Sequence, residues 1–235
     1  MGFLGDIFNT IFYQPLLRAL ILLYNYLPWH DLGIAVIVLT VLVKLALYPL
    51  GSKGIKSQKA LQDLQPKIKE VQERFKEDKT RQAKEVMDIY KKEKINPFSG
   101  FLLLLIQLPI LFALFRVFGW GIKGIGGLNT SFLGVINITE GSAILAILAG
   151  IAQFWQAKSL APRSGSRHAL QNHSKQTPDF SSIMQKQMLY FFPFFSIFIL
   201  WRMPSAVALY WLTTTLFTIF QQHITLKKNK NDPNK

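Results

Sequence analysis

The sequence contains no cysteine, and its charged residues are few and unevenly placed. Of its 235 residues, 17% are charged and 50% are hydrophobic, whereas soluble domains carry about 25% charged residues. Without cysteine the chain has no disulfides, thiolate metal sites or cysteine nucleophiles. Residues 51–96 hold 21 of the 40 charged residues. Long apolar runs between basic blocks are typical of a polytopic membrane protein and argue against a soluble or disordered chain.

Acidic side chains are missing from the apolar segments. Asp6, Asp31 and Glu140 lie beside them, and the other ten acids lie in polar stretches. Ion-coupled pumps usually need carboxylates within the membrane, and a paired-aspartate intramembrane protease needs two. The four histidines lack the spacing of metal ligands, and no GxSxG or GK[ST] motif is present. The sequence therefore predicts no enzyme, no metal site and no cofactor.

Five apolar segments predict an all-α membrane protein. The first contains 19 residues and would be about 28 Å long as a helix, enough to cross the hydrocarbon of a bilayer. Pro193 is expected to break the fourth. The expected transmembrane helices are 32–50, 98–118, 142–158, 186–201 and 205–224, joined by an outer loop at 119–141 and a cytoplasmic loop at 159–185, with a basic cytoplasmic tail at 225–235.

Residues 1–31 are predicted to form an amphipathic helix on the outer surface. Asp6, Thr10, Gln14 and Arg18 recur every four residues, and large apolar side chains cover the other face. A signal peptide would begin with a basic region, so an interfacial helix fits better. The alternative is a first transmembrane span over 11–27.

Residues 51–97 are predicted to form a helical hairpin in water. Their apolar residues follow alternating steps of three and four, and Pro66 is expected to start or kink the first arm. The hairpin is either a solvated coiled coil or a basic surface that could touch anionic lipid, RNA or a ribosome. The apolar seam consists of Leu61, Leu64, Ile68, Val71 and Phe75, then Ala83, Val86 and Tyr90.

The distribution of positive charge predicts the orientation. Segments 51–96 and 157–188 and the tail together hold 22 of the 27 lysines and arginines. Basic residues concentrate on the cytoplasmic side of membrane proteins, so the N-terminus is expected outside and the C-terminus in the cytoplasm. Trp29, Trp120 and Trp201 then fall at the outer ends of spans, where interfacial aromatic residues belong.

Lys44 is the one charge within the first span, about 18 Å from its outer end. A lysine there costs about 2.5–3.5 kcal/mol, so it either extends to the inner headgroups or faces a hydrated cavity. Thr40 lies one turn away on the same face. Polar residues of other spans are each able to join helices, but together they indicate a polar pocket. These are Gln107, Gln153, Gln156, Thr213, Thr214 and Thr215.

Short motifs follow one another in a specific order. They are Gln14-Pro15-Leu16, Thr40 to Leu50, Leu64-Gln65-Pro66-Lys67-Ile68, Tyr90 to Pro97, Leu105 to Ile110, Pro204 to Trp211 and Phe217 to Gln221. Over about 11–225 this order resembles the YidC/Oxa/Alb family of membrane-protein insertases, in the short bacterial form that lacks a large periplasmic domain.

The resemblance implies five core spans and a hydrophilic groove open to the cytoplasm and the lipid but closed outside. It implies an insertase and chaperone of the bacterial cytoplasmic (inner) membrane, which receives nascent hydrophobic segments and releases them laterally. Lys44 stands where the family usually has arginine. A lysine at this position keeps the positive charge but lacks the planar guanidinium that binds carboxylates through two hydrogen bonds. Thr40, Gln156 and Trp211 match other groove positions.

The partners that the resemblance implies are nascent membrane proteins and the lipid bilayer. The hairpin and the basic tail would contact the ribosome, the Sec translocon or signal-recognition components, and the functional unit would be a monomer. The residues themselves leave open a channel or small-solute carrier with a polar intramembrane site. They also leave open a scaffold for the assembly of membrane helices.

Overall fold

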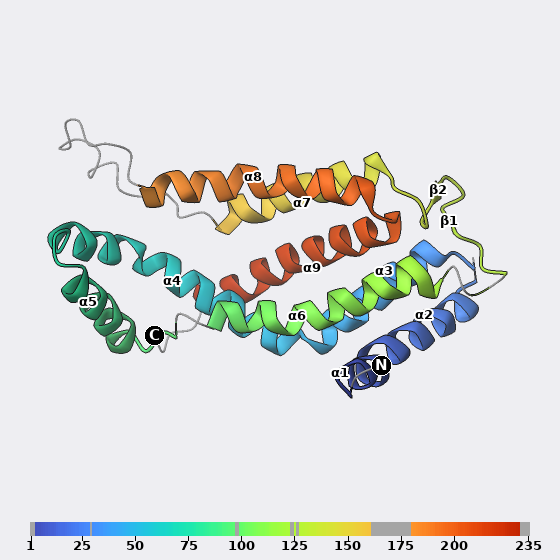
Figure 1. Cartoon of the computed structure of the whole chain (residues 1–235), viewed down its shortest axis with the longest axis horizontal. Coiled ribbons are helices and arrows are strands. Elements are labelled where there is room, and N and C mark those ends of the chain that lie inside the picture. The colour runs from blue at the N-terminus through green and yellow to red at the C-terminus, as the bar shows by residue number, and fades with distance from the viewer. Residues whose placement is uncertain are drawn as a thin grey trace.

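The computed structural model describes residues 3–28, 30–96, 99–122, 125, 127–160 and 180–230. Within these ranges the chain is a bundle of helices with one small two-stranded hairpin (Figure 1). Most of the loop expected over 159–185 lies outside the described residues, as do Trp29, the side chain of Trp120 and the end of the tail.

Five of the described helices occupy the apolar segments of the sequence. Helices α7 and α8 lie side by side, and α9 lies between this pair and the helices α3 and α6 (Figure 1). Their bounds are α3 (Leu32–Ala46), α6 (Ser99–Arg116), α7 (Ala143–Leu160), α8 (Phe180–Arg202) and α9 (Ser205–Lys230).

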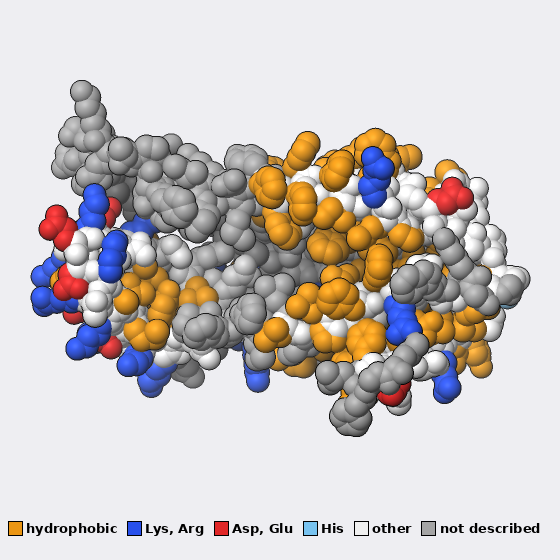
Figure 2. All heavy atoms as spheres, in the orientation of Figure 1, with side chains coloured by type: hydrophobic (Ala, Val, Ile, Leu, Met, Phe, Trp, Pro, Cys, Tyr) orange, Lys and Arg blue, Asp and Glu red, His pale blue; other side chains and the backbone are white. Residues whose placement is uncertain are grey.

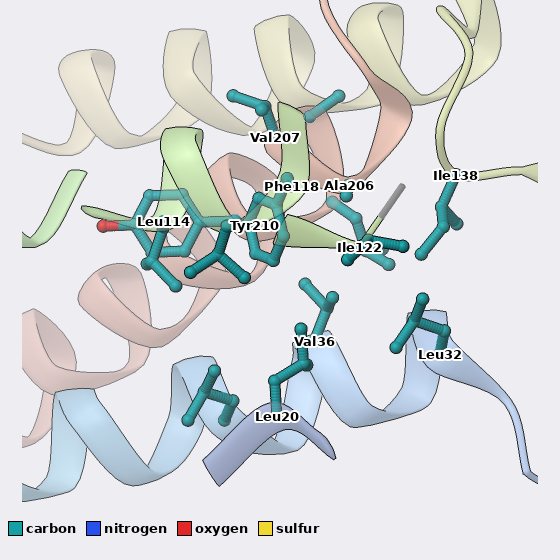
Figure 3. Close-up of a cluster of buried hydrophobic side chains, with 14 of the residues drawn as sticks. Leu20, Leu32, Val36, Leu114, Phe118, Ile122, Ile138, Ala206, Val207 and Tyr210 are labelled. Carbon is teal, nitrogen blue, oxygen red and sulfur yellow. The ribbon is translucent and has the colours of Figure 1, made fainter. Parts of the chain in front are cut away.

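The buried core joins α3, α6 and α9. Tyr210 and Val207 of α9, Leu114 of α6 and Val36 of α3 belong to one cluster of buried apolar side chains, together with Leu20 from the N-terminal helix (Figure 3). All five side chains are less than 10% exposed. The packing of apolar side chains therefore fixes the three helices relative to one another.

The N-terminal helix belongs to this bundle. It consists of α1 (Phe3–Phe8), the π-helical turn η1 (Asn9–Tyr13) and α2 (Gln14–Tyr26). A second π-helical turn, η2 (Val117–Gly121), extends α6, and the Arg116 guanidinium lies 5.0 Å from the centre of the Tyr13 ring. The segment expected to lie at the membrane surface thus packs along α3 and α6.

By length and composition, the 22-residue stretch Gly5–Tyr26 is able to cross a membrane. Leu32–Ala46 and Tyr48–Arg74 would count as a second span only if this pair, bent by 70°, were one broken helix. Gln107–Gly119 and Phe191–Arg202 are shorter apolar helices. Among the described helices, length and composition thus identify one or two possible spans. The expected number of five spans stays a prediction.

Two prolines change the expected boundaries. The span expected over 32–50 is divided, because α3 ends at Ala46 and α4 (Tyr48–Arg74) begins with Pro49 in its first turn. Proline suits a helix start but disrupts a helix interior. Pro193, by contrast, does not break the fourth segment, since α8 continues through it. Membrane helices tolerate proline where neighbouring polar groups satisfy the carbonyl oxygen four residues earlier, which loses its helix donor.

The hairpin of α4 and α5 (Lys79–Lys92) extends from one end of the bundle (Figure 1). Leu64 and Ile68 of the apolar seam are buried, and Pro66 lies inside α4. Polar contacts also join the two helices: the Gln82 amide donates to the Gln72 carbonyl oxygen at 2.7 Å. Leu64 and Ile68 are thus the buried part of the expected seam, whereas no residue of α5 is buried and Ala83 is exposed. Packing of the two helices along the whole seam stays a prediction.

Candidate functional site

Lys44 lies in the last turn of α3, half-buried beside the bend into α4. Its ammonium group makes no ion pair and no hydrogen bond with any residue that the structure describes. The ion pairs of the described chain all lie on the α4–α5 hairpin: Lys59–Asp63, Lys67–Glu93 and Asp88–Lys91. As far as the described residues go, Lys44 is thus a charge without a partner at the edge of an apolar bundle, and such a charge attracts anionic groups.

Thr40 is buried one turn before Lys44. Its side chain is 1% exposed, and its hydroxyl donates a hydrogen bond of 2.6 Å to the Val36 carbonyl oxygen of the same helix. The donor of Thr40 is therefore already used inside α3.

A second polar site joins α6 to α9. The Gln107 amide donates a hydrogen bond to the Tyr210 hydroxyl, which is buried. Thr214 lies one turn further along α9, and its buried Oγ1 has no hydrogen-bond partner among the described residues. Sequence reasoning missed Tyr210 as a site residue, although its spacing of four from Thr214 places both on one face of α9.

Gln153 and Gln156 lie on successive turns of α7 and differ in their surroundings. The Ser196 hydroxyl of α8 donates to the Gln153 side-chain oxygen, so Gln153 joins two helices. Gln156 is half-buried, and among the residues described its side chain has no hydrogen-bond partner. Its backbone oxygen accepts from Ser159 at 2.7 Å. Gln156 therefore keeps a free amide near the end of α7.

An apolar cavity of about 320 Å³ lies between α6, α8 and α9. Phe112 and Phe192 are 59% and 50% exposed, so the cavity opens on the surface of the bundle. Helices α6 and α8 make few contacts with each other. On the face that Figure 2 shows, apolar side chains lie over much of the bundle, with isolated charged ones among them, whereas charged side chains gather at the hairpin. The cavity is lined by Leu111, Phe112, Phe115, Phe192, Phe195, Ser196, Ile199, Leu200, Met203, Val207 and Trp211.

Two adjacent glutamines, which sequence reasoning also missed, connect α9 to both sides of the bundle. The Gln221 amide donates to the Tyr48 carbonyl oxygen at 2.8 Å and to Ser52 Oγ at 3.1 Å. The Gln222 side-chain oxygen accepts from the Ser159 hydroxyl at 3.1 Å. Gln221 and Gln222 are at most 5% exposed. The signal in the sequence was a pair of polar residues in the last part of an apolar helix. Burying such side chains costs free energy unless they form hydrogen bonds.

The structure thus brings Gln107 together with Thr214 near Tyr210, and it places Trp211 at the apolar cavity. Gln153 instead pairs with α8, and Thr40 lies in the core of the bundle. Within the described ranges there is no group of three or more His, Asp or Glu side chains that could hold a metal ion.

Within its described residues, the bundle combines a cation without a partner, polar groups between helices and an apolar cavity open at the surface, and these features fit a membrane protein. The family model described as "60Kd inner membrane protein" matches residues 22–232, and the chain belongs to this family of inner membrane proteins.

Proteins of similar sequence support the assignment to this family. The chain is 34% identical over 199 residues to a protein of Fusobacterium nucleatum named membrane protein insertase YidC, covering 84% of this chain and 87% of that one. A Clostridium tetani protein of the same name is 34% identical over 209 residues, covering 88% of each. The Syntrophus aciditrophicus protein of that name is 33% identical over 215 residues, covering 92% of this chain but 36% of its own length.

A solved structure has the same fold. It is described as an active YidC insertase crystal structure with the first transmembrane domain resolved, and it matches with a TM-score of 0.62 and 25% identity. The match covers 93% of this chain and 46% of the solved one. The chain therefore spans about half of that protein, and about a third of the longer relatives. The names of the relatives denote an insertase rather than a class of enzyme.

Proposed function

We propose that this chain is a membrane-protein insertase and chaperone of the bacterial cytoplasmic membrane. It receives nascent hydrophobic segments from the cytoplasm and releases them sideways into the bilayer. Membership of a family whose relatives are named insertases supports this function. The observation in the chain itself that carries the proposal is the half-buried ammonium group of Lys44, which has no ion pair among the residues that the structure describes.

Lys44 acts on the hydrophilic tail of the client. Moving a charged side chain to the middle of a bilayer costs about 2.5–3.5 kcal/mol on insertion scales. A recess that already holds a positive charge attracts an acidic tail and so offsets part of this free-energy cost. With no nucleotide motif in the sequence, hydrophobic partitioning and the membrane potential drive the transfer.

The other candidate residues divide into two groups. Gln107 and Thr214 flank the buried Tyr210 between α6 and α9. The side-chain amide of Gln156, which has no partner among the described residues, offers hydrogen bonds to a polar tail. Trp211 lies at the apolar cavity, and the few contacts between α6 and α8 make that cavity the lateral exit for an apolar segment. Thr40 and Gln153 stabilise the helices that hold these groups.

The proposed topology has five core spans, an outer N-terminus and a cytoplasmic C-terminus. The α4–α5 hairpin then lies in the cytoplasm, where 13 basic residues in 51–96 are available to the ribosome, the translocon or signal-recognition components. The protein works as a monomer. The alternative of a carrier for small polar solutes is less favoured, because Ser196 and Trp211 are the only residues with polar side chains among the described residues that line the cavity.

Insertion into proteoliposomes tests the role of Lys44. Clients that differ only in the charge of their translocated tail are presented to wild type, Lys44→Arg and Lys44→Glu. Lys44→Arg should retain insertion of acidic-tailed clients, and Lys44→Glu should abolish it while inserting neutral-tailed clients. Wild-type insertion of acidic tails by a correctly folded Lys44→Glu protein would refute the role of Lys44.

A further inference from the structure

The outer loop contains a hairpin whose turn breaks the usual sequence rule. Strands β1 (Ser131–Phe132) and β2 (Ile136–Asn137) are antiparallel, and the Val135 amide donates to the Phe132 carbonyl oxygen at 3.0 Å. The turn residues Leu133 and Gly134 have φ values of 51° and 71°. The register leaves three residues, 133–135, between the strands. Asparagine and glycine adopt positive φ most readily, because a bulky side chain is strained there. Leucine occupies the position where asparagine would fit better.

The hairpin is fixed to the bundle on the α3 side. The buried carboxylate of Asp31 accepts a hydrogen bond from the Leu133 amide at 2.7 Å and another from the Ile34 amide at 3.0 Å. The Phe132 ring lies so close to Gly33 that a Cβ there would come within 2.2 Å of it. Asp31 therefore holds Leu133 in its strained conformation and ties the turn to the first residues of α3.

The other side of the hairpin is fixed to the start of α9. The Ala206 amide donates to the Ile138 carbonyl oxygen at 2.9 Å, and the Ser205 amide donates to the Glu140 carbonyl oxygen at 2.6 Å. The turn is thus a rigid feature at the end of the bundle opposite the α4–α5 hairpin (Figure 1).

This rigid turn exposes two large apolar side chains. Leu133 is 65% exposed and Val135 is 82% exposed. Residues 128–139 contain no charged side chain, so the turn has no complement for a charged partner. Through Gly141, which packs on the Trp201 backbone, the hairpin is continuous with exposed Trp201 at the end of α8. A strained, uncharged, apolar turn next to an exposed tryptophan fits the boundary between headgroups and acyl chains.

We propose that the β1–β2 turn inserts Leu133 and Val135 into the outer leaflet of the bilayer and so anchors the outer end of α3. The occupant of this surface is lipid. Because the turn is tied to Asp31 and Gly33, its depth sets the depth of α3, and with it the height of Lys44 in the membrane.

Quenching of a fluorescent label tests the insertion. The absence of cysteine allows single labels at Leu133→Cys or Val135→Cys in the full chain, reconstituted in bilayers. Matched controls are Lys76→Cys on the charged hairpin and Phe194→Cys, whose side chain is 74% exposed on apolar α8. Labels on the turn should be quenched by lipids with a nitroxide high in the acyl chain and protected from aqueous iodide. Labels quenched by iodide as at Lys76, or protected from both quenchers by a protein partner, would overturn the proposal.

A second variant tests the anchoring. Leu133→Asn combined with Val135→Ser removes the apolar side chains but suits the turn, so folding should be retained. A label at Leu42→Cys, on the exposed face of α3, reports the depth of that helix. In the double variant, the label at Leu42→Cys should lie at a different depth in the bilayer than in the labelled chain without the two turn substitutions. An unchanged depth in the folded double variant would overturn the anchoring role.

Discussion

The side-chain amide of Gln221 donates a hydrogen bond to the backbone oxygen of Tyr48, 173 positions earlier in the chain, at 2.8 Å. Tyr48 is the first residue of α4, directly after the 70° bend from α3. Gly51 makes the contact possible, because a Cβ at this position would come within 2.8 Å of the Gln221 nitrogen. The end of α9 thus holds the base of the charged hairpin, one turn away from Lys44.

Gln221→Leu should loosen the hairpin. The variant removes the donor to Tyr48 and Ser52 and leaves their oxygens without it, so the direction of α4 relative to α9 should vary more. Spin labels at Lys84 and Phe220 measure this as a broader distance distribution.

His223→Leu is the matched control for Gln221→Leu, because His223 is exposed on the same helix. It should leave the distribution unchanged, whereas Gly51→Ala should reproduce the broadening by displacing Gln221. A distribution in Gln221→Leu as narrow as that of the wild type would show that Gln221 does not set the hairpin direction.

Ser196→Ala should weaken the pairing of α7 with α8. The hydroxyl donates to Gln153, and hydrogen bonds between membrane helices contribute about 0.6 kcal/mol on average. We expect a small loss of thermal stability in detergent. Ser159→Ala, which removes a more exposed hydroxyl at the end of α7, should have less effect. Equal losses in the two variants would contradict the assignment of Gln153 as a residue that joins the helices.

Leu111→Trp should obstruct the lateral cavity. Leu111 lines this space of about 320 Å³, and an indole is large enough to fill a substantial part of it. We expect slower insertion of clients with bulky apolar segments, measured in proteoliposomes, with the fold retained. Leu148→Trp places the same side chain on the exposed face of α7 and should insert clients at the wild-type rate. Unimpaired insertion by Leu111→Trp would exclude the cavity as the exit.

The sequence was informative where local chemistry decides the structure. The spacing of the hairpin seam predicts the burial of Leu64 and Ile68, and the order of motifs predicts the family that the comparisons confirm. Pro49 marks the start of α4, but the expected span extended past it because the whole stretch is apolar. A proline next to the break decided the boundary against mean hydropathy.

Long-range pairing is what the sequence could not provide. Gln153 and Gln156 are equally polar and three residues apart, yet only the tertiary fold brings Ser196 to one of them. Tyr210 lies 103 positions from Gln107, so its role at the polar site depends on how α6 packs against α9. The strained conformation of Leu133 likewise requires the carboxylate of Asp31, 102 positions away.

Photo-crosslinking to nascent chains tests the central claim most directly. A crosslinking residue at Phe115, in the wall of the cavity, is compared with one at Trp155, whose side chain is 67% exposed on α7 away from the cavity. Ribosome-bound chains of increasing length carry a single apolar segment. The account predicts that crosslinks form at Phe115 as the segment emerges from the ribosome and are absent at Trp155. Crosslinks to lipid alone at Phe115, at every chain length, would contradict it.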